Sequence, residues 1–301
     1  DGIRGQVIVR GGEVFVWSRG EELVTDRFPE FQFFKELLPD GTVLDGEIIP
    51  MKDNVPLPFG ELQRRIGRKT VGKKLIEEVP IHLIAYDLLE YEGKDLRDTE
   101  LSERRSKLEA LHRAHGHERF RLSKLVAFSS WSELHEVRNK AREDHCEGLI
   151  LKQKNSPYRI GRKKGDWWKW KVDPLVIDAV MIYAQKGHGR RANLYTDFTF
   201  AVWNDKQLVP FTKAYSGLTD AEMREVDAFV KKNTLERFGP VRSVNAELVF
   251  EIAFEGINRS TRHKSGVALR FPRISRWRRD KPKEEANTLA DLKQLLEAYS
   301  A

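Results

Sequence analysis

The sequence predicts an α+β domain followed by an all-β barrel of the OB type. Three observations lead to this prediction. The chain has 301 residues, a length that suits two domains. Its first half alternates short apolar runs of strand length with helical patterns. After Asp173-Pro174 the pattern changes to consecutive strands interrupted by one helix, as in small Greek-key barrels. We therefore expect domains at residues 1–173 and 174–301.

The first domain is expected to open with a β-hairpin. Apolar and polar residues alternate on both sides of Gly11-Gly12, a dipeptide that suits a tight turn. Further along, short runs rich in Ile, Leu and Val predict strands at residues 43–49, 81–89 and 148–153.

Helices are expected between these strands. Residues 101–115 carry leucines at positions that share one helical face. A second helix is predicted to begin at Ser130, where Glu133 three residues later completes a capping-box pattern. We expect this helix to extend to about residue 144.

The second domain is expected to consist mainly of antiparallel strands. Turn sequences such as Gly187-His188-Gly189 separate them. A helix with a capping box is predicted to begin at Thr219, with Glu222 three residues later, and to end before Gly239. A terminal helix is expected from Thr288. The predicted strands cover residues 175–185, 194–204, 207–215 and 246–257.

The composition indicates a globular protein with a polyanionic partner. Hydrophobic residues make up 40% of the chain and charged residues 33%, which excludes collagen and low-complexity chains. The chain has no run of 18 apolar residues, and its N-terminus lacks the pattern of a signal peptide. Cys146 is the single cysteine, which fits a cytoplasmic protein, and we expect it to be buried. The net charge of +7 favours a polyanion.

Basic residues are concentrated in three blocks. Residues 152–171 carry eight basic side chains against one acidic, residues 259–281 carry nine against one, and residues 64–74 carry six against none. Each block alone is typical of a solvated face. Two of them are interleaved with Trp and Phe, which favours binding of phosphate or nucleic acid. The histidines show no metal spacing, and those at residues 112–117 are expected to be exposed.

Short strings of residues place charged side chains at the ends of apolar runs. Each alone can also be a turn or the wet face of a strand. Their order and spacing together resemble the covalent nucleotidyltransferase superfamily and, within it, the ATP-dependent DNA ligases of bacteria. The strings are DGIR (1–4), SRG (18–20), LDGE (44–47), AYD (85–87), EGLILK (147–152), WWKWK (167–171) and HKSGVALRFPRISRWRRDK (263–281).

The resemblance implies a nucleotidyltransferase (adenylation) domain and an OB-fold domain that together seal 5′-phosphate/3′-hydroxyl nicks in duplex DNA. It implies ATP and Mg²⁺ or Mn²⁺, and a role in DNA replication, repair or recombination. A lysine takes AMP from ATP, AMP passes to the 5′-phosphate, and the 3′-hydroxyl displaces it. The family signature begins Lys-x-Asp-Gly-x-Arg, so the nucleophilic lysine is expected two residues before Asp1. The chain is therefore expected to be N-terminally incomplete.

The resemblance also implies roles for individual residues. Implied as catalytic are Asp1, Arg4, Lys169 and Lys171. Implied in ATP or AMP binding are Arg4, Arg19, Glu47, Tyr86, Glu147, Lys152, Lys169, Lys171, Arg273, Arg278 and Lys281. Glu47 and Glu147 are also implied as metal ligands, which suits the preference of Mg²⁺ for oxygen. Implied in DNA binding are Arg19, Arg162, Lys163, Lys164, Arg270 and Arg276.

The last basic string is implied to close over the nucleotide while pyrophosphate leaves. Such closure requires a hinge near residues 171–174. The alternative is that this string only contacts the DNA backbone. The residues concerned are Arg270, Arg273, Arg276, Arg278 and Lys281.

Two other functions fit the same sequence. An mRNA-capping guanylyltransferase shares the two-domain plan, although the RFPR string at residues 270–273 favours a ligase. A non-catalytic nucleic-acid-binding protein on this scaffold would not need Glu47, Glu147, Lys169 and Lys171. Nothing favours an oligomer. We therefore expect a monomer with nicked duplex DNA as its partner, no membrane association, and a place at the nucleoid in a bacterium.

Overall fold

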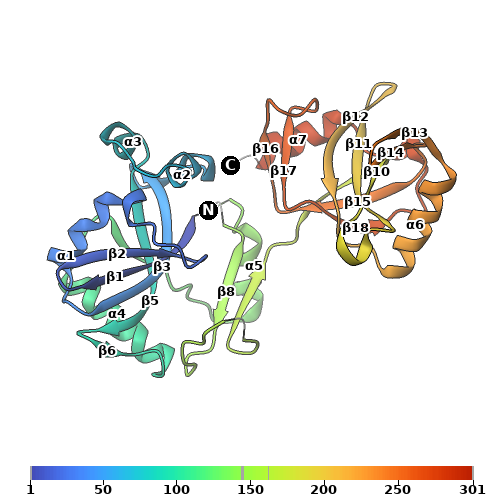
Figure 1. Ribbon diagram of the computed structural model, residues 1–301. Helices are drawn as coiled ribbons and strands as arrows, with labels where there is room; N and C mark the ends of the chain where they lie inside the picture. Colours follow the sequence, from blue (N-terminus) through green and yellow to red (C-terminus); the bar gives the residue numbers. More distant parts are fainter. Residues whose placement is uncertain (1, 144–145, 162, 300–301) are drawn as a thin grey trace. The chain divides into compact units, whose positions relative to one another are not determined.

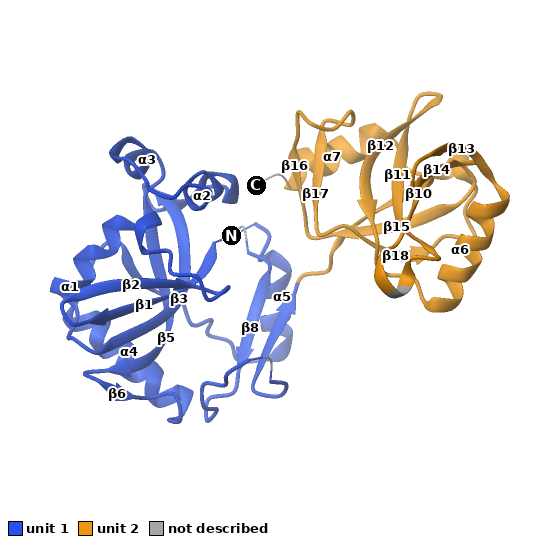
Figure 2. Cartoon of the chain, viewed as in Figure 1, with its two compact units in different colours: residues 1–171 blue, residues 172–301 orange. Residues whose placement is uncertain are grey.

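The computed structural model describes residues 2–143, 146–161 and 163–299 (Figure 1). The chain divides into two compact units, Asp1–Lys171 and Val172–Ala301 (Figure 2). Each unit has an apolar core of its own, so each buries its apolar surface independently. The domain boundary expected near residue 173 lies beside this break and stays a prediction.

Unit 1 is built on a largely antiparallel sheet with the strand order β2-β1-β3-β5-β6. β4 pairs with β3, and β7 runs parallel to β5. Gly11 and Gly12 lie at φ +63° and +73°, left-handed values that favour glycine and suit a tight hairpin turn. The predicted hairpin and the strands at 43–49 and 81–89 are confirmed. The strands are β1 (Ile3–Arg10), β2 (Glu13–Ser18), β3 (Thr42–Lys52), β4 (Val55–Pro56), β5 (Ile81–Tyr91), β6 (Lys94–Asp95) and β7 (Phe120–Leu122).

Short helices complete the core of unit 1. α4 buries Leu101, Leu108 and Leu111, as their spacing predicts. Phe31 and Phe34 are fully buried and contact each other edge to face, with ring centroids 5.5 Å apart. The helices are η1 (Thr25–Arg27), η2 (Pro29–Phe33), α1 (Phe34–Leu37), α2 (Phe59–Ile66), α3 (Lys73–Glu78), α4 (Leu101–Ala114) and α5 (Trp131–Lys140).

α5 differs from the prediction in two details. It ends at Lys140 rather than near residue 144, and residues 144–145 lie outside the described part of the chain. The side chain of Ser130 accepts a hydrogen bond from the backbone of Glu133, as expected. The Glu133 carboxylate, however, accepts from Ser129 instead of from the backbone of Ser130, so the expected capping box is only half formed.

A two-stranded ribbon of β8 (Gly148–Lys152) and β9 (Trp167–Lys171) completes unit 1, and α5 lies beside it in Figure 1. Gly148 has φ +135°, and a Cβ there would lie 2.3 Å from the carbonyl oxygen of Trp170. Glycine is therefore required where the two strands approach. Ile150 pairs with Lys169, and Lys152 with Trp167, so these side chains share one face of the ribbon.

Unit 2 is a strongly curved antiparallel sheet. β10 pairs with β15 along residues 175–180 and with β11 along residues 180–186. This change of partner along one strand, together with irregularities in the β10–β11 pairing, curls the sheet toward a barrel. The strands are β10 (Leu175–Lys186), β11 (Tyr195–Asn204), β12 (Gln207–Ala214), β13 (Thr234–Phe238), β14 (Val241–Val244), β15 (Val249–Phe254), β16 (Gly256–Arg259), β17 (Val267–Arg270) and β18 (Arg273–Trp277).

The helices of unit 2 agree with the prediction. α6 has the capping box expected from Thr219 and Glu222, and it ends before Gly239, at Lys232. Residues 234–238 then pair with β14 as strand β13, which the sequence pattern did not predict. α7 begins one residue after Thr288, as expected. The helices are η3 (Gly189–Arg191), α6 (Asp220–Lys232), η4 (Lys283–Glu285) and α7 (Leu289–Tyr299).

Two expectations about single residues are wrong. Cys146 is exposed rather than buried, because it precedes the edge strand β8 instead of packing into the sheet. His112 and His117 are partly buried. His112 lies within 2.9 Å of the Phe120 carbonyl oxygen, and the His117 ring stacks on Phe33 at 4.0 Å. No helix in the described part of the chain is long and apolar enough to cross a membrane.

One fully buried ion pair joins α4 to β5. Arg104 donates from Nε and Nη2 to the carboxylate of Asp87 at 2.7 and 3.0 Å, and both side chains have no exposed surface. Arg104 also donates to the carbonyl oxygens of Thr99 and Ser156. The pair therefore ties helix, sheet and the segment after β8 together.

Replacing Arg104 by leucine should destabilise unit 1 by about 3–5 kcal/mol, since Asp87 would keep a buried charge without a partner. Urea unfolding followed by tryptophan fluorescence measures the change. Arg97→Ala is the matched control, because Arg97 pairs with Asp95 at an exposed position and should cost less than about 1 kcal/mol. Equal losses in the two variants would contradict this account.

Candidate functional site

A buried carboxylate lies at the centre of the candidate site in unit 1. Asp45 on β3 has no exposed surface. Arg4 donates to its two oxygens from Nε at 3.0 Å and Nη2 at 2.6 Å. The hydroxyls of Tyr158 and Tyr86 donate to it at 2.6 and 3.1 Å. These donors compensate the buried charge, and the hydrogen bond to Asp45 raises the pKa of Arg4.

Strand register explains how these residues meet. Arg4 on β1 lies opposite Glu47 on β3, and Gln6 lies opposite Asp45, so these side chains share one face of the sheet. Between β3 and β5 the register shifts at Asp45 and Gly46. The shift leaves Tyr86 as the extra residue on β5, which turns its hydroxyl toward Asp45.

Glu47 is partly buried beside this centre. Burial raises the pKa of its carboxyl group, while the positive charges of Lys169 and Arg4 act in the opposite direction. Lys169, on the β8–β9 ribbon, is thus near enough to Glu47 for its charge to act on that carboxyl group. The expected nucleotide-binding residues Arg4, Glu47 and Lys169 therefore belong to one charged neighbourhood.

Lys152 lies between two aromatic rings. Its Nζ atom is 4.5 Å from the ring centroid of Tyr86 and 4.0 Å from that of Trp167. Burial lowers the pKa of this ammonium group to about 8, although Asp87 and Asp45 act to raise it. Aromatic faces attract a cation but replace its water only in part. Lys152 thus links the ribbon to the expected adenine-stacking residue, Tyr86.

Two contacts hold Lys171, the last residue of β9. Lys171 forms an ion pair with Glu147 at 3.0 Å, and Arg138 on α5 donates to the Lys171 carbonyl oxygen at 2.7 Å. Lys169 is exposed. Lys171 and the implied metal ligand Glu147 are therefore neighbours before any ligand binds.

The remaining implied residues of unit 1 are more dispersed. Arg19 is exposed in the turn after β2, and Lys163 and Lys164 are exposed in the segment between β8 and β9. The structure does not show contacts that bring these three to the Asp45 centre. Asp1 and Arg162 lie outside the described residues.

In unit 2, the last basic string is paired with acidic residues of neighbouring strands. Arg278 and Lys281 both donate to one oxygen of Asp178 on β10, at 2.6 and 2.7 Å. The other oxygen of Asp178 is buried and has no hydrogen-bond partner among the described residues. Arg278 also donates to Asp280, the largest cause of its raised pKa. The structure thus brings the two implied nucleotide contacts Arg278 and Lys281 together.

Of three other arginines of the string, Arg273 and Arg276 lie on β18 of the large sheet, whereas Arg270 ends β17 in the separate two-stranded sheet of β16 and β17. Arg273 pairs with Glu255 at 2.9 Å and Arg276 with Glu251 at 3.1 Å. The guanidinium group of Arg270 lies over the exposed ring of Phe271, 5.3 Å from its centroid. The ion pairs of Arg273 and Arg276 offset part of the positive charge of the string. The contact of Arg270 with the Phe271 ring involves no acidic group.

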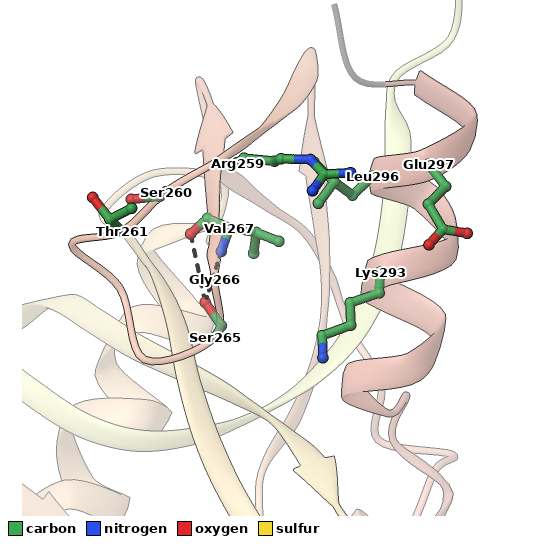
Figure 3. Close-up of a pocket in the computed structure, with 9 residues that line it drawn as sticks. All are labelled: Arg259, Ser260, Thr261, Ser265, Gly266, Val267, Lys293, Leu296 and Glu297. Atoms are coloured by element: carbon green, nitrogen blue, oxygen red, sulfur yellow. Dashed lines mark hydrogen bonds between the residues drawn. The ribbon is translucent and has the colours of Figure 1, made fainter.

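Unit 2 also has an open cavity of about 430 Å³, which the sequence did not predict (Figure 3). The loop after β16 and the helix α7 line it from two sides, with Arg259 on one and Lys293 on the other. Ser265 and Glu297 also line it, so its charge is mixed. Because it is open, the cavity does not form an enclosed small-molecule site.

The carboxylates that the sequence implied as metal ligands fit a loosely held ion. Among the described residues no three His, Cys, Asp or Glu side chains gather into a metal-binding cluster. Mg²⁺ usually keeps several waters and is held by one or two carboxylates together with substrate phosphates. The partly buried Glu47 and the Lys171-paired Glu147 match that donor set.

A sheet domain with arginine, lysine and carboxylate side chains gathered on one face, followed by an OB-type barrel, defines the nucleotidyltransferase class. Residues 1–171 match the family model described as "ATP dependent DNA ligase domain", and residues 191–281 match "ATP dependent DNA ligase C terminal region". The chain therefore belongs to the family of ATP-dependent DNA ligases. The family and the fold class expected from the sequence motifs are confirmed.

Individual relatives show the same likeness. A protein of Koribacter versatilis named "Probable DNA ligase" is 36% identical over 96% of this chain and 54% of its own length. A "DNA ligase" of Natronomonas pharaonis is 34% identical over 98% of this chain and 53% of its own. The chain thus spans about half the length of these relatives. A solved structure titled "Pmar-Lig_PreS3" has the same fold, with a TM-score of 0.71, 19% identity, and coverage of 92% of this chain and 62% of its own.

Sequence reasoning missed two residues of the site. Asp45 stands in the LDGE string, but nothing in the string marks it as the carboxylate that Arg4 and the tyrosines share. Tyr158 lies among basic residues with no motif signal of its own. A tyrosine followed within ten residues by the WWKWK strand is the feature that could have directed attention to it.

Lys152 should lose its proton at about pH 8 instead of near 10.5, because burial between Tyr86 and Trp167 disfavours its charged form. An NMR titration of the lysine side-chain ammonium signals measures the midpoint, and Lys152→Arg identifies the signal by its disappearance. Lys154→Arg, which changes an exposed lysine nearby in the chain, is the control and should leave the Lys152 signal in place. A Lys152 midpoint above 10 would contradict the assignment.

Proposed function

We propose that the protein seals nicks in duplex DNA with ATP, through lysyl-AMP and DNA-adenylate intermediates. The supporting observation is the connected charged neighbourhood of unit 1, in which Arg4, Glu47, Tyr86, Lys152 and Lys169 come from five strands to one face. Residues 1–173 would act as the adenylation domain and residues 174–301 as the OB-fold domain. Membership of the ATP-dependent DNA ligase family supports this function.

The chemistry of the reaction matches the residues of this neighbourhood. Each of the transfers builds negative charge on phosphate oxygens, which fixed cations stabilise. Lys169 and Lys171 would hold the α-phosphate, and Arg4 would contact the nucleotide sugar and the nick phosphate. Tyr86 would stack on adenine, since its ring is held by the hydrogen bond of its hydroxyl to Asp45.

A divalent metal ion would be held by Glu47 and Glu147. When bound, such an ion offsets charge on the phosphate oxygens and lowers the barrier to displacement. We propose Mg²⁺ or Mn²⁺, because carboxylate oxygens are hard ligands that suit both ions.

Three cations of unit 2, namely Arg273, Arg278 and Lys281, would act in the first step only. Arg278 and Lys281 would contact ATP while pyrophosphate leaves, and Arg273 would assist them. Both cations are held by Asp178 in the described structure, so contact with phosphates requires them to exchange this carboxylate or share it. A hinge near residues 171–174 would permit the movement.

DNA would bind through exposed basic side chains of both units, mainly by phosphate contacts. The implied contacts in unit 1 are Arg19, Arg162, Lys163 and Lys164, and those in unit 2 are Arg270 and Arg276. The capping-enzyme alternative is not favoured, because both family models are of DNA ligases. The monomeric state and the place at the nucleoid stay predictions.

The 301-residue chain should seal a nick that already carries a 5′-adenylate, because this step needs no nucleophilic lysine. Gel separation of the joined strand after incubation with Mg²⁺ measures the reaction. Lys169→Ala combined with Lys171→Ala should slow sealing about a hundredfold, since two cations at the phosphate are removed. Lys154→Ala, which changes an exposed lysine of the following segment, should have no effect. Failure of the unaltered chain to seal this substrate would overturn the proposed function.

Changing Arg278 and Lys281 together to alanine should separate the steps of the reaction. In a form of the protein that carries the Lys-x dipeptide of the family signature ahead of Asp1, self-adenylation from ATP should be abolished, because the cations that orient pyrophosphate are missing. Sealing of a pre-adenylated nick should continue at a substantial rate. Intact-mass spectrometry follows the AMP adduct and a gel assay follows sealing. Equal losses in both assays would instead assign these residues to DNA binding.

A further inference from the structure

We infer that Tyr158 is a positioning residue for Arg4, which it fixes so that one edge of the guanidinium group faces the reacting phosphate. This inference rests on the proposed function and adds a residue to it. Tyr158 lies in the segment that connects β8 to β9, at the opposite end of unit 1's sequence from Arg4. Neither a motif nor the charge pattern of the sequence marks it.

The hydroxyl group of Tyr158 has three hydrogen-bond partners, of which the side chain of Gln6 is the most distant, at 3.4 Å. It donates to Oδ2 of Asp45 at 2.6 Å and accepts a hydrogen bond from Nη2 of Arg4. A phenol has one proton to donate, and here that proton goes to the carboxylate. Nη2 of Arg4 is therefore shared between Asp45 and Tyr158, which holds the guanidinium plane from two directions.

This arrangement leaves a defined edge of Arg4 available. Asp45 accepts hydrogen bonds from Nε and Nη2 of Arg4, and the Tyr158 hydroxyl accepts a second one from Nη2. Nη1 has no hydrogen-bond partner among the residues that the structure describes, and the Arg4 side chain is 38% exposed. A guanidinium group is a rigid planar fork, so fixing one edge also fixes the direction of the other. Nη1 is thus the atom that would meet a phosphate or ribose oxygen.

Tyr158 can hold Arg4 because it is itself held. Its backbone N–H donates to the carbonyl oxygen of Arg97 at 2.7 Å, and its ring meets Trp167 edge to face with centroids 6.0 Å apart. Two residues earlier, the Ser156 carbonyl oxygen accepts from Arg104, a member of the buried pair with Asp87. The hydroxyl is therefore anchored to the core of unit 1 and not to a freely moving loop.

Removing the hydroxyl should loosen Arg4 without unfolding the site. In Tyr158→Phe the Asp45 carboxylate keeps its contacts with Arg4 and with Tyr86, so its buried charge remains compensated. We expect the single-turnover rate constant for sealing a pre-adenylated nick to fall about tenfold at saturating DNA, the effect of one lost charge-assisted hydrogen bond. The dissociation constant for DNA and the thermal midpoint should stay close to those of the unaltered chain.

A double-mutant cycle distinguishes positioning from a separate role. Tyr158→Phe should add no further loss in an Arg4→Ala background, because the residue that it positions is then absent. Tyr91→Phe is the matched control, since it also removes a phenol hydroxyl from unit 1, but at the end of β5, where Tyr91 pairs with Lys94 of β6. This control should seal at the parental rate. Independent, multiplicative losses in the cycle, or a parental rate in Tyr158→Phe, would overturn the inference.

A second measurement tests the inference even if the chain seals nothing. Rotation about the Nε–Cζ bond of Arg4, followed by NMR of the guanidinium nitrogens, should be slow in the unaltered chain and faster in Tyr158→Phe. Equal rotation rates would show that Tyr158 does not position Arg4. Slow rotation in a chain that fails to seal any nick would overturn the proposed function and leave the positioning role standing.

Discussion

Burial of the Asp45 carboxylate is the constraint on which the rest of the candidate site depends. A carboxylate without exposed surface is tolerated only when hydrogen bonds and an opposite charge compensate it. Arg4, Tyr86 and Tyr158 supply that compensation from three separate parts of the chain. The strands that carry Arg4 and Tyr86 must therefore keep their register, and the segment that carries Tyr158 must keep its position. The side chains that would bind a nucleotide are fixed as a consequence.

Unit 2 also has a buried aspartate, Asp178, that accepts hydrogen bonds from basic side chains. Asp178 collects Arg278 and Lys281 on one oxygen, 100 or more residues along the chain from itself. Long basic side chains lose considerable rotamer entropy when they are ordered. Pairing on a buried carboxylate orders them during folding, which would lower the entropy lost in binding an anion. In both units the cations of the proposed site are thus already ordered by an aspartate.

The structure also shows which basic residues have a structural role inside the fold and which are exposed to solvent. Arg65 belongs to the basic block at residues 64–74, yet it is fully buried and holds Glu30 through two hydrogen bonds of 2.6 and 2.7 Å. Arg104 and Arg138 likewise serve the core or the ribbon. A count of charges along the sequence cannot make this distinction, because burial depends on which elements pack together.

The sequence by itself determined the order of most elements and the strings that carry the site. Alternating and helical periodicities are local, so the hairpin at Gly11-Gly12 and the leucine face of α4 could be derived from neighbouring residues. Only the tertiary structure decided that residues 234–238 form a strand and that Cys146 is exposed. It alone also decided that Asp45 joins Arg4 to Tyr158. These partners lie 41 and 113 residues from Asp45 in the chain, and only strand register and the path of the β8–β9 connection bring them together.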